Sequence, residues 1–478
     1  MNRRFLLIAL LALILTFAAA CGGAATEPEV EESEPVASTT TEEEADEEEM
    51  AEEEPVEEEM VEEEVAEEPA EEPTEEPVEE PAEEMADEAS GDPVPIGVLL
   101  PATGPVGWVA DAIPAIELAV EDINAAGGVH GRPIEIFIED SEAVAAAAIA
   151  GATKMLDVNE VVALIGPTSL TIRSVMPLVQ ERGVAEISPT AGTTALDTLG
   201  GEYVFRTVSS DTVMGTGMAW FAKNELGAEK VALFFADTES AASVGGVLRT
   251  ATEVLGLEIV ADVTYVEGAS SYRSELIEVS ANSPDVIFFE GGPDSSAVFF
   301  AQKNELGLGG TWLGTDFVND PFAEATGDTG EGVMAVNPAP ELSDRFVEWQ
   351  GRLEEKRGVE GVPAFSANAY DAMVIVALAL EASEEVGREG VIANLREVAN
   401  GPGEMVTNFA DGKAMLASGQ AVDYDGLAGA QDFNDFGDVI TALRAVEIQG
   451  GTLNRTASIT QGDIGDTLQQ VLEKISQQ

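Results

Sequence analysis

Cysteine and histidine are almost absent, because each occurs only once in 478 residues, as Cys21 and His130. One cysteine cannot form an intramolecular disulfide, and this pair of residues cannot build the common zinc sites. The sequence also lacks a P-loop and a G-x-S-x-G nucleophile motif. We therefore expect no enzyme activity, no cofactor and no metal site. We interpret His130, in "GGVHGRP", as an ordinary turn residue.

Positively charged residues are also scarce. Only 22 Lys and Arg face 91 Asp and Glu, which gives a net charge of −69. The segment 22–92 holds 34 of the acidic residues and no basic one, and 93–478 still carries 57 acidic against 20 basic residues. Such a surface repels phosphate backbones and anionic lipid headgroups. Nucleic acid is therefore excluded as a partner.

The acidic segment 22–92 also lacks the residues that build a core. It repeats units such as "EEPVEEEMVEEEVAEEPAEEP", with prolines every few residues and unbroken like charge. Such a composition cannot bury enough apolar surface to offset the entropy lost on ordering. We expect a disordered linker that could extend to about 200 Å at roughly 3.3 Å per residue. Binding of cations or of a partner protein remains an alternative role.

The first 21 residues have the layout of an export signal. Arg3 and Arg4 precede an apolar run from Phe5 to Phe17, which is too short for a membrane span, and Ala18-Ala19-Ala20 lead to Cys21. A cysteine at this place resembles the bacterial lipobox, which implies lipidation and a stable anchor. The alternative is a secretory signal with an incidental cysteine. We expect the protein at the outer face of the cytoplasmic membrane, with the membrane as a partner through the lipid.

From residue 93 onward, short apolar runs alternate with segments of helical period. "VPIGVLLP", "PIEIFIED", "VVALIG" and "GVAEISP" read as buried strands, with helix patterns between them. The same alternation starts again at "KVALFFAD". This βαβ order predicts an α/β fold with two doubly wound lobes. Helix patterns after residue 342 have no strands of their own, so we expect them to cover the earlier lobes.

In open α/β sheets, ligands bind at the carboxyl ends of the strands, beside helix N-termini. Three such loops are expected in the first lobe and three in the second: 101–109, 166–169, 188–194, 237–240, 291–295 and 314–316. Two of them, "GPTS" and "SPTAGTT", are rich in hydroxyl groups. These hydroxyls could cap the following helices, bind a ligand, or do both.

At this point the sequence resembles the type I periplasmic binding-protein family, in particular the branched-chain amino-acid (Leu/Ile/Val) binding proteins of ABC importers. The matching stretches are "IGVLLPATGPVG", "AIELAVEDINAAGGVHGRPIEIFIED", "VVALIGPTSLT", "ERGVAEISPTAGTT", "FRTVSSD", "DVIFFEGG", "GTDF" and "NAYDAMVIVALAL". The resemblance implies two Rossmann-like lobes joined by three hinge crossings, near Val208, Val336 and Arg444. The implied parts are a signal peptide (1–21), a linker (22–92), lobe 1 (93–208 and 337–443), lobe 2 (209–336 and 444–460) and a C-terminal tail (461–478).

The resemblance also implies a binding site. In the amino-acid binders a serine and a hydroxyl-rich loop of the first lobe hold the ligand carboxylate, and an acid of the second lobe holds its ammonium group. These roles fall on Ser169 with Thr168, on Thr190, Gly192 and Thr193, and on Asp316. Asp316 could instead be a surface charge or a helix N-cap.

Three features depart from the family pattern, one of which is that the second-lobe loop 237–242 lacks the family's tyrosine. Gly192 stands where the family has a threonine, so we expect only its backbone N–H to serve, unless Thr193 substitutes. Trp108 lies one place before the position of the family's aromatic residue, and Val109 holds that position. We therefore include Trp108 among the candidate ligand contacts.

The resemblance implies a solute-binding lipoprotein that captures a small polar ligand and delivers it to an ABC permease. The expected ligand is an amino acid, of the branched-chain type, or a related carboxylate or amide. An alternative is a sensor module of a signalling system that uses the same two-lobed clamshell without transport.

Overall fold

The computed structural model of the protein describes residues 89–338 and 342–477. The predicted signal peptide (1–21), Cys21 and nearly all of the acidic linker (22–92) lie outside the described residues. The expectations about export, lipidation and the linker therefore stay predictions.

The first sheet is parallel throughout, with the strand order β2-β1-β3-β4-β5. Its strands are β1 (Val94–Leu100), β2 (Ile134–Asp140), β3 (Ala163–Ile165), β4 (Ala185–Ser188) and β5 (Val204–Arg206). The intervening helices are η1 (Gly107–Ala112), α1 (Ile113–Ala125), α2 (Ala145–Asp157), α3 (Ile172–Arg182) and η2 (Thr194–Asp197). This is the doubly wound order that the alternating pattern predicts.

Both faces of this sheet are covered, which explains why its strands read as continuous apolar runs. Val98 and Leu100 of β1 join one buried cluster, whereas Leu99 joins another on the opposite face with residues of α2 and α3. The period of two in a strand sends neighbours to opposite faces. We call the elements around this sheet lobe 1.

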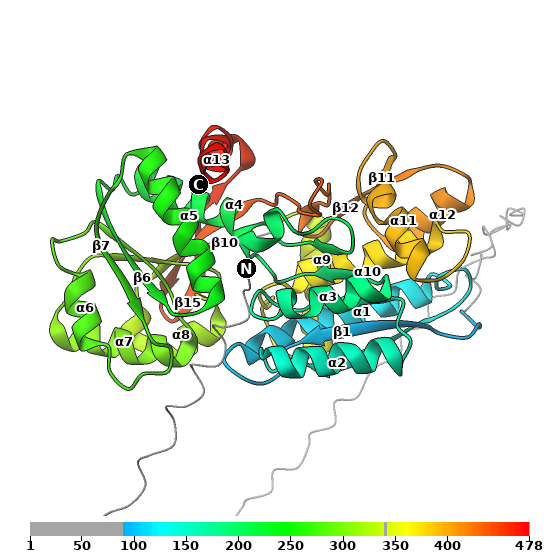
Figure 1. Cartoon of the computed structure of the whole chain (residues 1–478), viewed down its shortest axis with the longest axis horizontal. Coiled ribbons are helices and arrows are strands. Elements are labelled where there is room, and N and C mark those ends of the chain that lie inside the picture. Colours follow the sequence, from blue (N-terminus) through cyan, green and yellow to red (C-terminus); the bar gives the residue numbers. More distant parts are fainter. Residues whose placement is uncertain (1–88, 339–341, 478) are drawn as a thin grey trace, which may run out of the picture. The chain divides into compact units, whose positions relative to one another are not determined.

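Helices from the C-terminal part of the chain complete lobe 1. They are α9 (Asp344–Arg357), α10 (Ser366–Glu381), α11 (Arg388–Ala399) and α12 (Phe409–Ala417). Helix α10 packs between α1 and α11 and is buried on nearly every side, as its unbroken apolar run "AMVIVALAL" requires. In Figure 1 these yellow and orange helices lie beside the blue and cyan elements of the first sheet. A small sheet of β11 (Glu404–Val406), β12 (Val422–Gly426) and β13 (Gly429–Ala430) extends this part.

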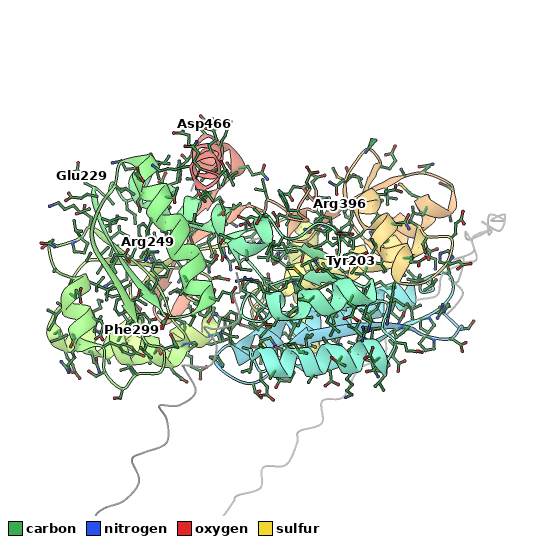
Figure 2. All side chains as sticks on the ribbon, viewed as in Figure 1. Tyr203, Glu229, Arg249, Phe299, Arg396 and Asp466 are labelled. Atoms are coloured by element: carbon green, nitrogen blue, oxygen red, sulfur yellow. The ribbon has the colours of Figure 1, made fainter. Side chains whose placement is uncertain are left out.

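The second sheet has the order β15-β14-β10-β9-β8-β6-β7. Its parallel strands are β6 (Lys230–Ala236), β7 (Glu258–Tyr265), β8 (Val286–Glu290), β9 (Thr311–Gly314) and β10 (Met334–Pro338); β14 (Leu443–Gln449) and β15 (Thr452–Ile459) are antiparallel. Its helices are α4 (Asp211–Asn224), α5 (Glu239–Leu255), α6 (Arg273–Val279), α7 (Pro293–Leu306), α8 (Asp320–Thr326) and η3 (Gly327–Gly330). We call these elements lobe 2. Phe299, labelled in Figure 2, belongs to its aromatic core.

The end of the chain differs from the expected tail. Residues Gln461–Ile475 form helix α13, which Thr460 and Asp463 start with a capping box. Ile464, Leu468 and Val471 are buried in the core of lobe 2, against α4 and α5. Their spacing of four and three residues is that of one helix face. Asp466, labelled in Figure 2, belongs to the same helix. Helix α13 is therefore part of lobe 2.

The chain passes between the lobes three times: between β5 and α4, between β10 and α9, and between β13 and β14. Hydrogen bonds tie the first and third passages together. Ser209 Oγ and Thr441 Oγ1 lie 2.7 Å apart, and Thr441 N–H also donates to Ser209 Oγ at 2.7 Å. The expected fold with three hinge crossings is confirmed.

Candidate ligand-binding site

Loops from both lobes enclose one cavity of about 560 Å³, its open mouth included. All three predicted loops of lobe 1 contribute residues to this cavity, and two of the three predicted loops of lobe 2 do so as well. A neighbouring cavity is lined by the remaining loop, at Gly291 and Gly292. The main cavity is lined by Val106, Trp108, Val109, Thr168, Ser169, Leu170, Thr190, Gly192, Val208, Ser209, Asp211, Met214, Ser240, Asp316, Phe317, Pro338 and Phe365. The strand-end rule therefore located the cavity.

Ser169 is held in a defined orientation. Its Oγ accepts a hydrogen bond from Thr193 N–H at 3.2 Å, and the side chain is buried against the cavity. An N–H that occupies an oxygen lone pair leaves the hydroxyl proton free to donate. Helix α3 begins only at Ile172, and its N-cap residue Thr171 makes no side-chain cap bond. Ser169 is thus available to a ligand as a donor and does not cap the helix.

Thr168, Thr190 and Trp108 carry buried polar groups that lack a partner. Thr168 Oγ1, Thr190 Oγ1 and Trp108 Nε1 make no hydrogen bond within the described part of the chain, and all three residues line the cavity. A buried polar group without a partner costs about 1–3 kcal/mol. A ligand that accepts hydrogen bonds would recover this energy.

The loop after β4 is held from behind by Ser188 and Arg206. Ser188 Oγ accepts from the N–H groups of Thr190 and Ala191 at 3.2 and 2.9 Å. The guanidinium of Arg206, fully buried, donates through Nη1 to the carbonyls of residues 191, 192 and 193 at 2.8–3.2 Å. Asp438 and Asp197 pair with the same guanidinium at 2.7 and 2.5 Å. The carbonyl groups of residues 191–193 therefore already have a hydrogen-bond donor, the Arg206 guanidinium.

Gly192 makes room for Asp211. A Cβ at position 192 would lie 2.1 Å from Asp211 Oδ1, far inside van der Waals contact. Asp211 N–H also donates to the Gly192 carbonyl at 2.7 Å, so the two residues are joined through the backbone. The glycine that replaces the family threonine is thus coupled to a carboxylate at the start of α4. Asp211 lines the cavity, and its Oδ2 has no partner within residues 89–338 and 342–477.

Two cavity carboxyl groups hold their protons more tightly than usual. Burial raises the pKa of Asp211 to about 7, and the nearby Asp316 adds to the rise. Burial raises the pKa of Asp316 to about 6. Asp316 is half-buried and does not cap a helix, because α8 begins at Asp320 with Asn319 as its N-cap. A ligand cation between these groups would favour their ionised forms.

An aromatic group closes the cavity at the junction of the lobes. The Trp108 ring stacks on Phe365 at 6.0 Å between centroids and meets the edge of Phe317 at 5.7 Å. Phe365 has a φ of +65°, a left-handed conformation that is unfavourable for a bulky side chain. Such strain persists where surrounding packing imposes it and is concentrated at functional sites.

Contacts across the cleft join the lobes beside the cavity. Thr194 N–H donates to Ser243 Oγ at 2.9 Å, and Arg173 pairs with Glu239 at 3.2 Å. Residues 173 and 194 belong to lobe 1, and residues 239 and 243 to helix α5 of lobe 2. The two lobes therefore contact each other beside the cavity, as is expected for the closed form of a two-lobed receptor.

The structure brings together six of the seven predicted ligand contacts. Thr193 is the exception, because its side chain accepts from Ala195 N–H at 3.4 Å and caps η2, and it does not line the cavity. Asp211 and Phe365 were missed. Asp211 belongs to "FRTVSSD", where it reads as an ordinary first-turn acid, and Phe365 carries no sequence signal for its backbone strain.

Residues 89–338 and 342–477 contain no cluster of three or more His, Cys, Asp or Glu side chains suited to a metal ion. Over the same residues, no helix has both the length and the apolar character of a membrane span.

A cavity between two α/β lobes that three chain passages connect is the arrangement of a two-lobed small-molecule receptor. Comparison with known proteins gives the family: residues 93–452 match the family model described as periplasmic binding protein. The chain belongs to this family, and the predicted resemblance is confirmed.

Two relatives of known name show the range of the family. The chain is 26% identical, over 72% of its length and 84% of the relative's, to a chemotactic signal transduction system substrate-binding protein, BasB, of Halobacterium salinarum. It is 23% identical, over 64% of its length and 82% of the relative's, to a leucine-, isoleucine-, valine-, threonine- and alanine-binding protein of Pseudomonas aeruginosa.

Two solved structures are similar in fold. A leucine-binding protein LivK of Thermotoga maritima has a TM-score of 0.67 at 24% identity, covering 77% of this chain and 99% of its own. A solute-binding protein of an ABC transporter of R. palustris, in complex with benzoate, has a TM-score of 0.62 at 20% identity and covers 77% and 96%. The fold therefore accompanies chemically different ligands.

Proposed function

We propose that this protein is an extracytoplasmic receptor that captures a small amino acid between its lobes and delivers it to an ABC importer. One observation carries the proposal: hydroxyl and indole donors on lobe 1 and the carboxylates of Asp211 and Asp316 share one cavity, and several of these groups have no partner within the described residues. A zwitterion has the complementary charges.

The ligand carboxylate would accept hydrogen bonds from Ser169, Thr168 and Thr190. Its ammonium group would meet Asp316 and Asp211, which start or precede helices of lobe 2. Charge-assisted hydrogen bonds of this kind are about twice as strong as neutral ones. Because the donors and the acids lie on different lobes, the bound ligand would stabilise the closed form over the open one.

The rest of the lining of the main cavity is largely apolar. Val106, Val109, Leu170, Met214 and Phe317 contribute side chains without charge. Small-molecule sites typically combine such a lining with a few directed polar groups. The leucine-binding and Leu/Ile/Val/Thr/Ala-binding relatives support an amino-acid ligand.

The proposal includes a location for the protein outside the cytoplasmic membrane. Residues 1–21 would act as a signal peptide, lipidation of Cys21 would anchor the chain outside the cytoplasmic membrane, and 22–92 would be the spacer. Radiolabelled palmitate should be incorporated into the parent protein in bacterial cells, and the Cys21→Ser variant should remain unlabelled.

The test of function is a binding screen. Ligands that bind only the folded state raise the melting temperature of the purified protein. Leucine, isoleucine, valine, threonine and alanine are compared with their decarboxylated amines, their deaminated acids and benzoate. We expect the intact amino acids to bind at least tenfold more tightly than either truncated set. Equal affinity for benzoate or for the deaminated acids would contradict the roles of Asp211 and Asp316.

A sensor role is the second candidate, and the similarity to BasB favours it. The same cavity would then report ligand occupancy to a membrane signalling protein. Deleting the gene separates the two functions: loss of uptake of labelled ligand indicates transport, and loss of a taxis or transcriptional response with normal uptake indicates sensing.

A further inference from the structure

A second cavity adjoins the ligand cavity and contains acidic groups that the proposed function leaves unused. The two cavities share the lining residues Val106, Leu170, Ser240 and Phe317, and the second has a volume of about 370 Å³, mouth included. Glu290 and Glu267 line it. It therefore extends the cleft beyond the groups that would hold an amino-acid backbone.

Glu290 is an unusual residue at its position. It ends β8, "VIFFE", whose other four residues are apolar and buried, and it is itself only 2% exposed. Among the described residues, neither Oε1 nor Oε2 makes a hydrogen bond of good geometry, although the hydroxyl groups of Ser240 and Thr315 lie nearby. A buried charge without a partner costs several kcal/mol, so it needs a counter-charge or a proton.

Glu267 faces the same cavity from the loop after β7. Its Oε1 accepts from Gly292 N–H at 3.1 Å, whereas Oε2 has no partner among the residues described. Burial raises the pKa of Glu267, and burial together with Asp316 and Asp211 raises the pKa of Glu290. Glu290 therefore lies close enough to Asp316 and Asp211 for their charges to disfavour its own.

Arg206, behind the loop after β4, is near enough to act on Asp211, but it does not line either cavity. The described residues that line the two cavities include no Lys, Arg or His. The backbone around Glu290 is fixed, because its carbonyl accepts from Tyr265 Oη at 2.7 Å and the next carbonyl accepts from Ser296 Oγ at 3.1 Å. A counter-charge that replaces the proton on these acids would therefore have to come from the ligand.

We propose that the ligand is an amino acid with a cationic side chain, whose backbone occupies the main cavity and whose side-chain cation lies between Glu290 and Glu267. The inference rests on the proposed function, because it assigns the α-carboxylate and α-ammonium groups as above. An aliphatic side chain would leave Glu290 buried without a counter-charge, so a cationic side chain should bind more tightly than an aliphatic one of the same size. Lysine, ornithine and arginine have the required chemistry.

The test compares each cationic amino acid with a neutral analogue of the same size by calorimetry. Lysine is paired with norleucine, and arginine with citrulline. We expect the cationic member of each pair to bind at least tenfold more tightly to the parent protein. In the Glu290→Gln variant this ratio should fall to within about threefold, while the affinity for norleucine stays equal or rises. Glu278→Gln, on the exposed face of α6, serves as the matched control and should leave the ratio unchanged.

A second measurement covers the ligand-free protein. Glu290→Gln removes an unpartnered buried carboxyl group, so its melting temperature at pH 8 should equal or exceed that of the parent. Equal binding of lysine and norleucine to the parent, or an unchanged ratio in Glu290→Gln, would overturn the inference and leave the proposed function intact. Binding of a diamine such as cadaverine as tightly as lysine would instead contradict the proposed hold on the α-carboxylate.

Discussion

The carboxylate of Asp211 occupies the space that a side chain at Gly192 would need, with Oδ1 only 2.1 Å from the position of a Cβ there. The two residues belong to different lobes, since Gly192 follows β4 and Asp211 begins α4. The size of the residue at position 192 and the placement of the Asp211 carboxylate are therefore coupled.

This coupling predicts non-additive mutations. Gly192→Ala should lower the free energy of unfolding by about 1–3 kcal/mol, as overpacked sites do. Asp211→Ala should be neutral or stabilising, and the double variant should lose less stability than the sum of the two, by at least 0.5 kcal/mol. Urea unfolding of the four proteins measures this difference. Gly246→Ala is the control, because Gly246 is exposed on α5 with no atom within 4 Å of the new Cβ. If the losses of stability in Gly192→Ala and Asp211→Ala simply add in the double variant, the coupling is refuted.

Asp211 should also make stability depend on pH. Its pKa is about 7 in the folded protein against 3.8 ordinarily, so between these values the folded state binds more protons than the unfolded state. The free energy of unfolding therefore falls as the pH rises through this window. Glu290, Glu186 and Asp371 add slopes of the same sign, because burial raises their pKa values too.

The contribution of Asp211 is isolated by substitution. Asp211→Asn should flatten the fall in melting temperature between pH 4.5 and 7.5 relative to the parent. Asp344→Asn is the control, because Asp344 is exposed on the first turn of α9 and does not line the cavity. If the parent and Asp211→Asn show the same slope, Asp211 is not protonated in the folded protein in this range.

Ser169→Ala should weaken amino-acid binding about ten- to hundredfold, because a hydrogen bond to a charged group contributes about 1.5–3 kcal/mol. Stability should fall by only about 1 kcal/mol, since Thr193 N–H loses its acceptor. Calorimetry measures the first effect and thermal unfolding the second. Ser174→Ala, on helix α3 just after Ser169, should change neither by more than a small amount. Unchanged affinity in Ser169→Ala would remove Ser169 from the site.

Arg206→Met should be strongly destabilising, by about 3–5 kcal/mol, because it leaves Asp438 and Asp197 without their buried counter-charge. It should also loosen the loop 191–193, whose three carbonyls the guanidinium holds. Arg249→Met is the matched control: Arg249, labelled in Figure 2, forms a two-pronged pair with Asp262, but both side chains are partly exposed. Exposed pairs contribute about 1 kcal/mol or less. Comparable losses for the two variants would contradict the role assigned to Arg206.

The fold and the walls of the cleft could be predicted because both depend on local patterns. Alternating apolar runs and helix periods identified the two α/β lobes, and the strand-end rule located the loops that meet at the cavity. Residues 461–478 were predicted to be a tail because the resemblance ended near residue 448. The apolar residues at 464, 468 and 471, which are buried in α13, nevertheless have helical spacing.

The electrostatic part of the site could not be predicted in the same way. With 91 acidic residues in the chain, nothing in the sequence separates Asp211 or Glu290 from a surface acid. Their significance depends on desolvation and on the absence of nearby cations, which arise only when distant segments pack together. The left-handed backbone of Phe365, whose ring stacks on Trp108, likewise has no signal in the sequence.

The direction of β1 has a practical consequence for instrumentation. This strand enters lobe 1 at Val94, and the cleft loop follows its other end at Leu100, so about 20 Å of strand separates the two at 3.3 Å per residue. If the protein were attached to a solid support through a residue that precedes Val94, the attachment point would lie at the end of the sheet opposite the cleft. The protein could thus be immobilised by that end as a reagentless optical sensor, with a dye on the cleft rim reporting ligand.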